Sequence, residues 1–122
     1  MRELKIFVIT PVRNILPAWR QALDDYVRSL QQQNCQVYYP PWDTSQDDNT
    51  GLGICRCNRE ALIWADEVHI AWDGESEGCL FDLGMAFAFG KPVVPIVGFF
   101  PTMTQHKSFA TMVHDWAEKG RP

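Results

Sequence analysis

Apolar residues recur along this chain in two alternating periods, one typical of strands and one typical of helices. Residues 5–10 form a short, β-branched run of the kind found in a strand that is buried on both faces of a parallel sheet. Between Trp19 and Leu30, apolar residues return every three or four positions, which predicts an amphipathic helix ending near Asn34. Residues 35–39 then predict a second strand.

The alternation continues after a polar stretch. Residues 40–53 are rich in Pro, Asp, Asn, Thr and Gly and predict a loop. Residues 54–65 predict a second helix, and residues 67–72 predict a third strand.

The C-terminal third predicts two more helices and one more strand. A helix over residues 79–89 is apolar nearly all round, interrupted only by Asp82 and Gly84. Residues 93–97 predict a fourth strand, in which Pro95 lacks a backbone donor and therefore indicates an edge or bulged position. The last helix carries apolar residues at helical spacing: Phe109, Met112, Val113 and Trp116.

Strands that alternate with helices predict one α/β domain over residues 1–122, with a mostly parallel sheet and right-handed crossovers. Ligands of such sheets bind beyond the carboxyl ends of the strands, where the strand order reverses. The candidate ligand-binding segments are therefore residues 10–14, 42–53 and 73–82.

Composition narrows the class of partner. The 122 residues carry a net charge of −4 and contain no basic tract, which argues against binding to DNA or RNA. The longest apolar run, residues 92–98, is interrupted by Pro95 and is far shorter than the ~20 residues of a membrane span. The charged N-terminus shows no signal peptide. We expect a soluble, cytoplasmic protein that binds a small molecule.

Neither a metal nor an organic cofactor is expected. The four cysteines include a Cys-x-Cys at Cys55 and Cys57, but no Cys-x-x-Cys or paired histidines accompany it, so reduced thiols are the default. The first loop lacks the glycine fingerprint of a dinucleotide site and the lysine of a P-loop, and Gly51-x-Gly53 follows no strand.

Asp82 is the most unusual polar residue, because a carboxylate in an apolar helix is rarely buried without a partner. Near the start of its helix the dipole would favour the ionised form, and Gly84 would allow close approach of another backbone. Facing a pocket, such a carboxylate could serve as a nucleophile at a sugar carbon or as a general base. The alternative is an Asp that caps nearby amides.

Other polar residues at the same sheet edge have two interpretations each. Arg13 could hold a ligand phosphate or be a solvated surface residue. Ser76 could donate to a ligand, although helix capping is the commoner role. Acidic residues beside Trp42 could contact a base and a sugar or simply form turns; they are Asp43, Asp47 and Asp48.

Three segments in order resemble the nucleoside 2-deoxyribosyltransferase family. They are Lys5-Ile-Phe-Val-Ile-Thr-Pro-Val-Arg13, Asn58-Arg-Glu-Ala-Leu-Ile-Trp-Ala-Asp66-Glu-Val, and Ser76-x-Gly78-x-x-x-Asp82-Leu-Gly84-Met-Ala86 followed by Gly90-Lys-Pro-Val. The resemblance covers most of the chain, from residue 5 to about residue 97. It implies a flavodoxin- or Rossmann-like three-layer sandwich with a four- to five-stranded, mostly parallel sheet.

The resemblance also implies roles for individual residues. Asp82 stands where the family usually has a glutamate that attacks the anomeric carbon, and Asn58 stands where it usually has an aspartate that handles the base. Phe7 replaces a common tyrosine in the first strand. Arg13 and Ser76 resemble the branch that hydrolyses deoxynucleoside 5′-monophosphates. The remaining implied substrate contacts are Thr10, Asp43, Asp47 and Gly78.

Two function hypotheses and a weaker third follow. The first is an enzyme that cleaves or transfers at the N-glycosidic bond of a (2′-deoxy)nucleoside or its 5′-monophosphate, with a neighbouring subunit completing the site, as the family implies for a homodimer or higher homo-oligomer. The second is a non-catalytic nucleotide-binding or regulatory module on the same fold, motivated by the departures at Asp82 and Asn58. The third is a purely structural subunit, which would have no pocket near Asp82.

Overall fold

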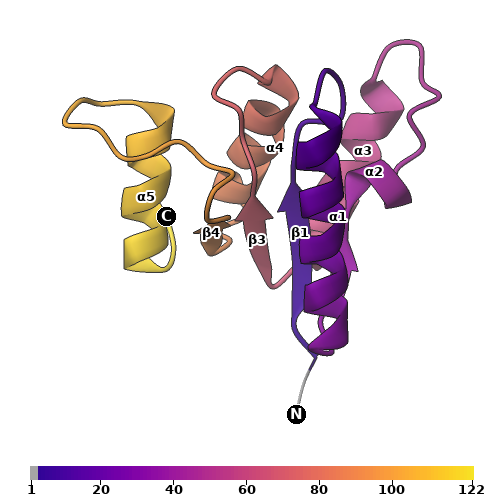
Figure 1. Cartoon of the computed structure of the whole chain (residues 1–122), viewed down its shortest axis with the longest axis horizontal. Helices are drawn as coiled ribbons and strands as arrows, with labels where there is room; N and C mark the ends of the chain where they lie inside the picture. Colours follow the sequence, from indigo (N-terminus) through magenta and orange to yellow (C-terminus); the bar gives the residue numbers. More distant parts are fainter. Residues whose placement is uncertain (1–2) are drawn as a thin grey trace.

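The computed structural model describes residues 3–122, a range that excludes Met1 and Arg2 of the charged N-terminus. Strands and helices alternate along the chain as predicted (Figure 1). The elements are β1 (Lys5–Ile9), α1 (Pro17–Gln32), β2 (Gln36–Tyr38), α2 (Pro40–Asp43), α3 (Leu52–Trp64), β3 (Glu67–Ile70), α4 (Glu77–Ala88), β4 (Val93–Pro95) and α5 (Phe109–Lys119).

The described strands form one four-stranded sheet in the order β2-β1-β3-β4. Every pairing is parallel: Phe7 of β1 is in register with Tyr38 of β2 and with Val68 of β3, which itself pairs with Val93 of β4. The α/β prediction is therefore confirmed, with four strands that are all parallel. Strand order reverses between β1 and β3, so the carboxyl ends of these two strands form the switch point.

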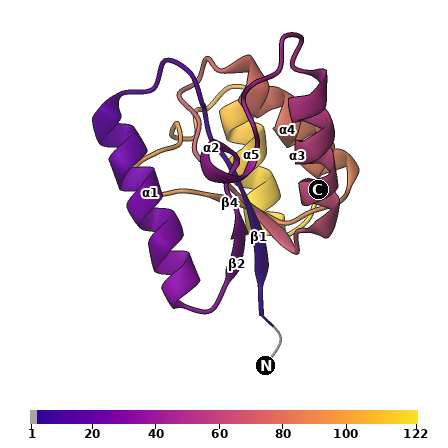
Figure 2. The same cartoon turned by 90° about the vertical axis from the view of Figure 1, so that its right-hand side faces the viewer.

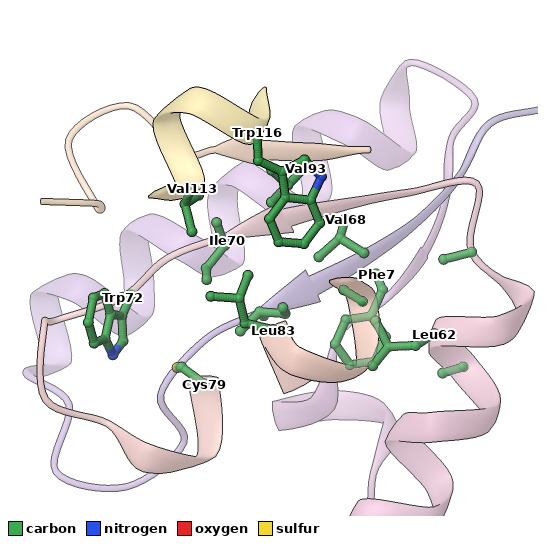
Figure 3. Close-up of a cluster of buried hydrophobic side chains, with 14 residues drawn as sticks. Phe7, Leu62, Val68, Ile70, Trp72, Cys79, Leu83, Val93, Val113 and Trp116 are labelled. Atoms are coloured by element: carbon green, nitrogen blue, oxygen red, sulfur yellow. The ribbon is translucent and has the colours of Figure 1, made fainter. Parts of the chain in front are cut away.

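The alternation of side chains along β1 divides the core into two layers. Ile6 and Val8 pack in a cluster with Leu23 and Val27 of α1 on one face. Phe7 and Ile9 belong to the opposite cluster, which includes residues of α3, α4 and α5 (Figure 3). Figure 2 shows the same division, with α1 on one side of the strands and the other three long helices on the other side. The result is a three-layer sandwich.

Pro95 ends β4, an edge strand of the sheet, and this confirms its predicted position. An edge strand leaves one row of backbone groups outside the ladder, so the missing donor of proline costs no sheet hydrogen bond there. The hydrogen bonding to β3 continues one residue after Pro95, where the Ile96 amide donates to the Ile70 carbonyl at 2.9 Å.

Two local expectations were wrong. The stretch predicted as continuous loop contains the short helix α2, because Pro40 and Pro41 preset helical φ angles and Asp43 Oδ2 accepts from the Tyr39 amide at 2.8 Å. In α5, Phe109 is exposed at the first position, and Ala110 is the residue of that turn that packs inward.

Across residues 3–122 no helix is long and apolar enough to cross a membrane, and no group of three or more His, Cys, Asp or Glu side chains is placed to hold a metal ion. All four cysteines are unpaired thiols. Burial raises the pKa of the Cys79 thiol to about 12, so this side chain stays protonated and packs as a small apolar group.

Candidate active site

A cavity of about 620 Å³ opens at the carboxyl ends of β1 and β3. Its walls come from the loop after β1, the first half of α3, the loop after β3 and the start of α4. This is the switch point of the sheet, where ligands of parallel α/β folds bind. Asp82 lies among the residues that line the cavity, so the idea of a structural subunit with no pocket near Asp82 was wrong.

Asp82 is the sixth residue of α4 and is 9% exposed. Burial raises the pKa of its carboxyl group to about 7, and a hydrogen bond from the Asn58 side chain opposes the increase without overcoming it. Burial therefore outweighs the stabilisation of the ionised form that was expected from the helix dipole. The dipole acts within the first turn, and Asp82 lies beyond it. Its hydrogen bond goes to a side chain and not to a backbone amide, which excludes the capping interpretation.

Three hydrogen bonds connect Asp82 to the second strand. Asn58 Nδ2 donates to Asp82 Oδ2 at 3.3 Å, and Thr44 Oγ1 donates to Asn58 Oδ1 at 2.9 Å. The hydroxyl groups of Tyr38 and Thr44 lie 2.6 Å apart. Asn58 and Thr44 are both buried, so the chain of polar groups is shielded from solvent up to the cavity wall.

The second carboxyl oxygen of Asp82 is open to the cavity. No protein group among the described residues donates to Oδ1, and no fully buried side-chain oxygen or nitrogen in that part of the chain lacks a partner. Oδ1 is therefore accessible, and Asp82 lines the cavity. One oxygen is held by Asn58 and the other is free to meet a ligand.

Six of the nine candidate site residues line the cavity: Thr10, Arg13, Asn58, Ser76, Gly78 and Asp82. The other three do not. Phe7 is fully buried and stacks on Tyr38 with ring centroids 5.5 Å apart, so it belongs to the core. Asp43 accepts from the Tyr39 amide, and Asp47 is exposed on the following loop, so neither lines this wall.

Ser76 occupies the N-cap position of α4, but its side chain makes no capping hydrogen bond. In the turn that precedes α4, Asp73 Oδ1 accepts hydrogen bonds from the amides of Glu75 and Ser76 at 2.9 Å and 2.8 Å. An internal carboxylate thus occupies backbone donors that a ligand anion could otherwise use. A hydrogen bond from the Ser76 side chain to the Cys79 thiol opposes the effect of burial on the pKa of that thiol.

The acidic loop before α3 has a structural role. Asp48 Oδ2 accepts from the Ile54 amide at 2.9 Å, and further backbone donors help to lower the pKa of this carboxyl group. A Cβ on Gly53 would meet Asp48 Oδ2 at 3.0 Å, so glycine permits this close approach. Trp42 packs edge-on against Tyr39 and lies under the Arg28 guanidinium, away from the cavity.

The sequence pattern missed several residues of the site. Asp73, Cys55 and Gln46 line the cavity, and Thr44 contacts it through Asn58. Asp73 follows a strand directly, which is a usable signal for a residue at the carboxyl edge. Thr44 carried no such signal, because it lies inside a polar stretch that was predicted to be loop. The close backbone approach expected at Gly84 is absent among the described residues, since a Cβ added there would meet no atom of another element within 4 Å.

The fold and site together define a three-layer α/β protein with a half-satisfied carboxyl group at the switch-point cavity. Solved structures with this fold include a 2-deoxyribosyltransferase from Bacillus psychrosaccharolyticus (TM-score 0.69, 19% identity, 91% of this chain and 80% of that chain). A conserved protein from Enterococcus faecalis V583 (0.66, 17%, 97% and 76%) and the CMP N-glycosidase BcmB from Clostridium botulinum (0.62, 14%, 91% and 81%) are also similar. The fold implied by the motif resemblance is thereby confirmed.

The sequence was also compared with family models and with curated proteins. No family model matches the chain, and no curated protein matches it. At 14% to 19% identity the solved structures establish the shared fold.

Proposed function

We propose that this protein cleaves or transfers at the N-glycosidic bond of a (2′-deoxy)nucleoside or a nucleoside 5′-monophosphate, with Asp82 as the nucleophile. The observation that carries the proposal is the Asp82 carboxyl group, buried at the base of a cavity with one oxygen held by Asn58 and the other open. A cavity of about 620 Å³ lies in the range of ordinary small-ligand pockets. Two proteins with the same fold are named for reactions at this kind of bond.

The proposed reaction has two steps. In the first, ionised Asp82 Oδ1 bonds to the anomeric carbon of the sugar as the bond from that carbon to the base nitrogen breaks. The base leaves with the electron pair and takes a proton from water. In the second step, water in a hydrolase, or a second base in a transferase, attacks the same carbon and releases the carboxylate. The incoming nucleophile loses one proton to solvent, and no oxidant or metal enters the balance.

The remaining lining residues supply binding. Arg13 is the cation on the cavity wall and suits a phosphate or a sugar hydroxyl. Thr10, Ser76 and Gly78 lie at the carboxyl edge of the sheet and would contact the sugar end. Asn58 has a second amide hydrogen that could reach a base, but an amide cannot transfer a proton to the leaving group.

The experiment is base release from a panel of nucleosides and 5′-monophosphates, with and without an acceptor base, followed by chromatography. Asp82→Ala should abolish release of free base and of the exchanged nucleoside. Glu118→Ala, which removes an exposed carboxylate from α5, is the matched control and should behave as wild type. Undiminished base release by the Asp82→Ala protein would overturn the assignment of the nucleophile.

A second candidate, a non-catalytic nucleotide-binding or regulatory module, is favoured by one observation. Among the described residues, the hydrogen-bond partner of the Asp82 carboxyl group is the Asn58 amide, which cannot protonate a leaving base. Calorimetry separates the two functions. A module would bind nucleosides with a measurable heat and release no base over days, whereas an enzyme would consume them.

We also propose that a second copy of the chain closes the cavity. Phe81 lines the cavity and is 55% exposed, so a large apolar surface at the cavity is free to be covered by a second copy. Light scattering after size exclusion gives the oligomeric state. Phe81→Asp should shift the protein to monomer and weaken nucleoside binding together, while a monomeric wild type with full base release would contradict the idea.

A further inference from the structure

We propose that Thr44 is a positioning residue: it holds the Asn58 amide in one orientation, with its N–H toward Asp82 Oδ2, and thereby leaves Asp82 Oδ1 as the oxygen that meets substrate. The inference rests on the proposed function for its meaning in catalysis. It concerns a residue that does not line the cavity and that acts through its neighbour.

The direction of each hydrogen bond follows from the donors and acceptors in the chain of groups. A side-chain amide presents a donor end and an acceptor end of nearly the same shape, so its orientation is set by its neighbours. Thr44 Oγ1 donates to Asn58 Oδ1 at 2.9 Å. The other amide end, Nδ2, is then directed at Asp82 Oδ2 at 3.3 Å.

Tyr38 removes the remaining ambiguity at Thr44. A threonine hydroxyl has a single proton, which is used on Asn58, so the Tyr38 hydroxyl donates to Thr44 in the short 2.6 Å contact, in preference to its longer 3.4 Å contact with the Asp43 carbonyl. Burial raises the pKa of Tyr38, so it remains a protonated donor at neutral pH. The stacking of Tyr38 on Phe7 in β1 fixes the ring that carries this hydroxyl.

The consequence for Asp82 is chemical. A carboxylate that accepts an N–H hydrogen bond is stabilised in its ionised form, which is the form that attacks carbon. If the amide turned, its oxygen would face Asp82 Oδ2 and would favour the protonated acid. Thr44 therefore biases the site toward the reactive charge state at a given pH.

The test compares the pH dependence of base release in wild type with that of three variants. Thr44→Val removes the hydroxyl at nearly constant volume and should move the acidic limb of kcat/KM upward by about half a pH unit to one pH unit. At pH 7 kcat should fall severalfold while KM changes little, and raising the pH should restore activity. Thr44→Ser keeps the hydroxyl and should restore the wild-type limb. Tyr38→Phe keeps the stacking ring and should shift the limb in the same direction by less.

A readout that needs no activity separates this inference from the proposed function. The carboxyl carbon of Asp82, followed by NMR with 13C label against Asp82→Asn as the assignment control, should titrate at higher pH in Thr44→Val than in wild type. The other ionisable groups around the cavity are common to all variants and cancel in this comparison: Arg13, Cys55, Asp73, Glu75, Glu77 and Cys79.

The outcomes are distinct. An unchanged titration of Asp82 in both Thr44→Val and Tyr38→Phe would overturn the positioning role, whatever the enzyme does. A shifted titration in a protein that releases no base would retain the role and refute only the proposed function. If Thr44→Val fails to fold, as judged by circular dichroism, Tyr38→Phe decides the question: an unchanged titration of Asp82 in that variant overturns the positioning role.

Discussion

Replacing Asp82 by asparagine should stabilise the protein while it abolishes the proposed chemistry. The side chain keeps its shape and can still accept from Asn58 at the same position. What it loses is the ability to ionise in a buried site. In wild type the pKa of this carboxyl group is raised from 3.8 to about 7 because burial disfavours the charge.

The magnitude follows from that difference in pKa. In the unfolded chain Asp82 loses its proton near its ordinary pKa, whereas the folded protein keeps it until about pH 7. The folded state therefore binds more protons between these values, and the free energy of unfolding falls as pH rises through this window. At about 1.4 kcal/mol per pH unit, the full loss reaches about 4 kcal/mol above pH 7. Because Asp82 lines an open cavity, this is an upper value.

Urea unfolding of the wild type and the Asp82→Asn variant at a series of pH values from 3 to 9 measures the effect. The two proteins should be equally stable near pH 3, where Asp82 is neutral in both states. Between pH 4 and pH 7 the free energy of unfolding of the variant should increase relative to that of wild type, and above pH 7 the difference should stay constant. Taking the difference at each pH cancels the titration of all other groups. Glu118→Gln, which removes an exposed charge, should track wild type within about 0.5 kcal/mol. A difference in the free energy of unfolding that does not increase with pH would refute the burial argument for Asp82.

Three further predictions rest on other contacts. Base release should rise with pH through about 7, tenfold per unit below it, because only ionised Asp82 attacks carbon; a pH profile flat from 5 to 8 would contradict this. Nucleosides should react better than their 5′-monophosphates, since Asp73 already occupies the amides of Glu75 and Ser76, and Asp73→Ala should narrow the ratio of the two kcat/KM values. Leu83 is 3% exposed and packs between α4 and the sheet. Leu83→Ala should therefore lower the free energy of unfolding by about 2–5 kcal/mol, measured as a lower midpoint of urea unfolding.

Much of the fold could be predicted from the local sequence, because the spacing of apolar residues indicates which face of a strand or helix is buried. The apolar run of β1 predicted a strand covered on both faces, and the structure places α1 on one face and α3 and α4 on the other. Pro95 predicted an edge because its missing donor is tolerated only there. Asp82 was recognisable because a charge on an apolar helix needs an explanation. The increase in its pKa could not be predicted, because the start of the helix is visible in the sequence and the burial of the side chain is not.

The sequence by itself determined the order of the elements, the α/β class and the identity of the anomalous carboxyl group, since each depends on residues within a few positions of one another. Only the tertiary structure decided what surrounds that group. Asn58 is 24 residues from Asp82, and Thr44 is 14 residues from Asn58, so their contacts exist only because α3 and α4 pack on the same face of the sheet. Phe7 also depends on the tertiary structure. The resemblance of its segment to the family predicted a place in the site, but the alternation of side chains along β1 directs Phe7 into the core.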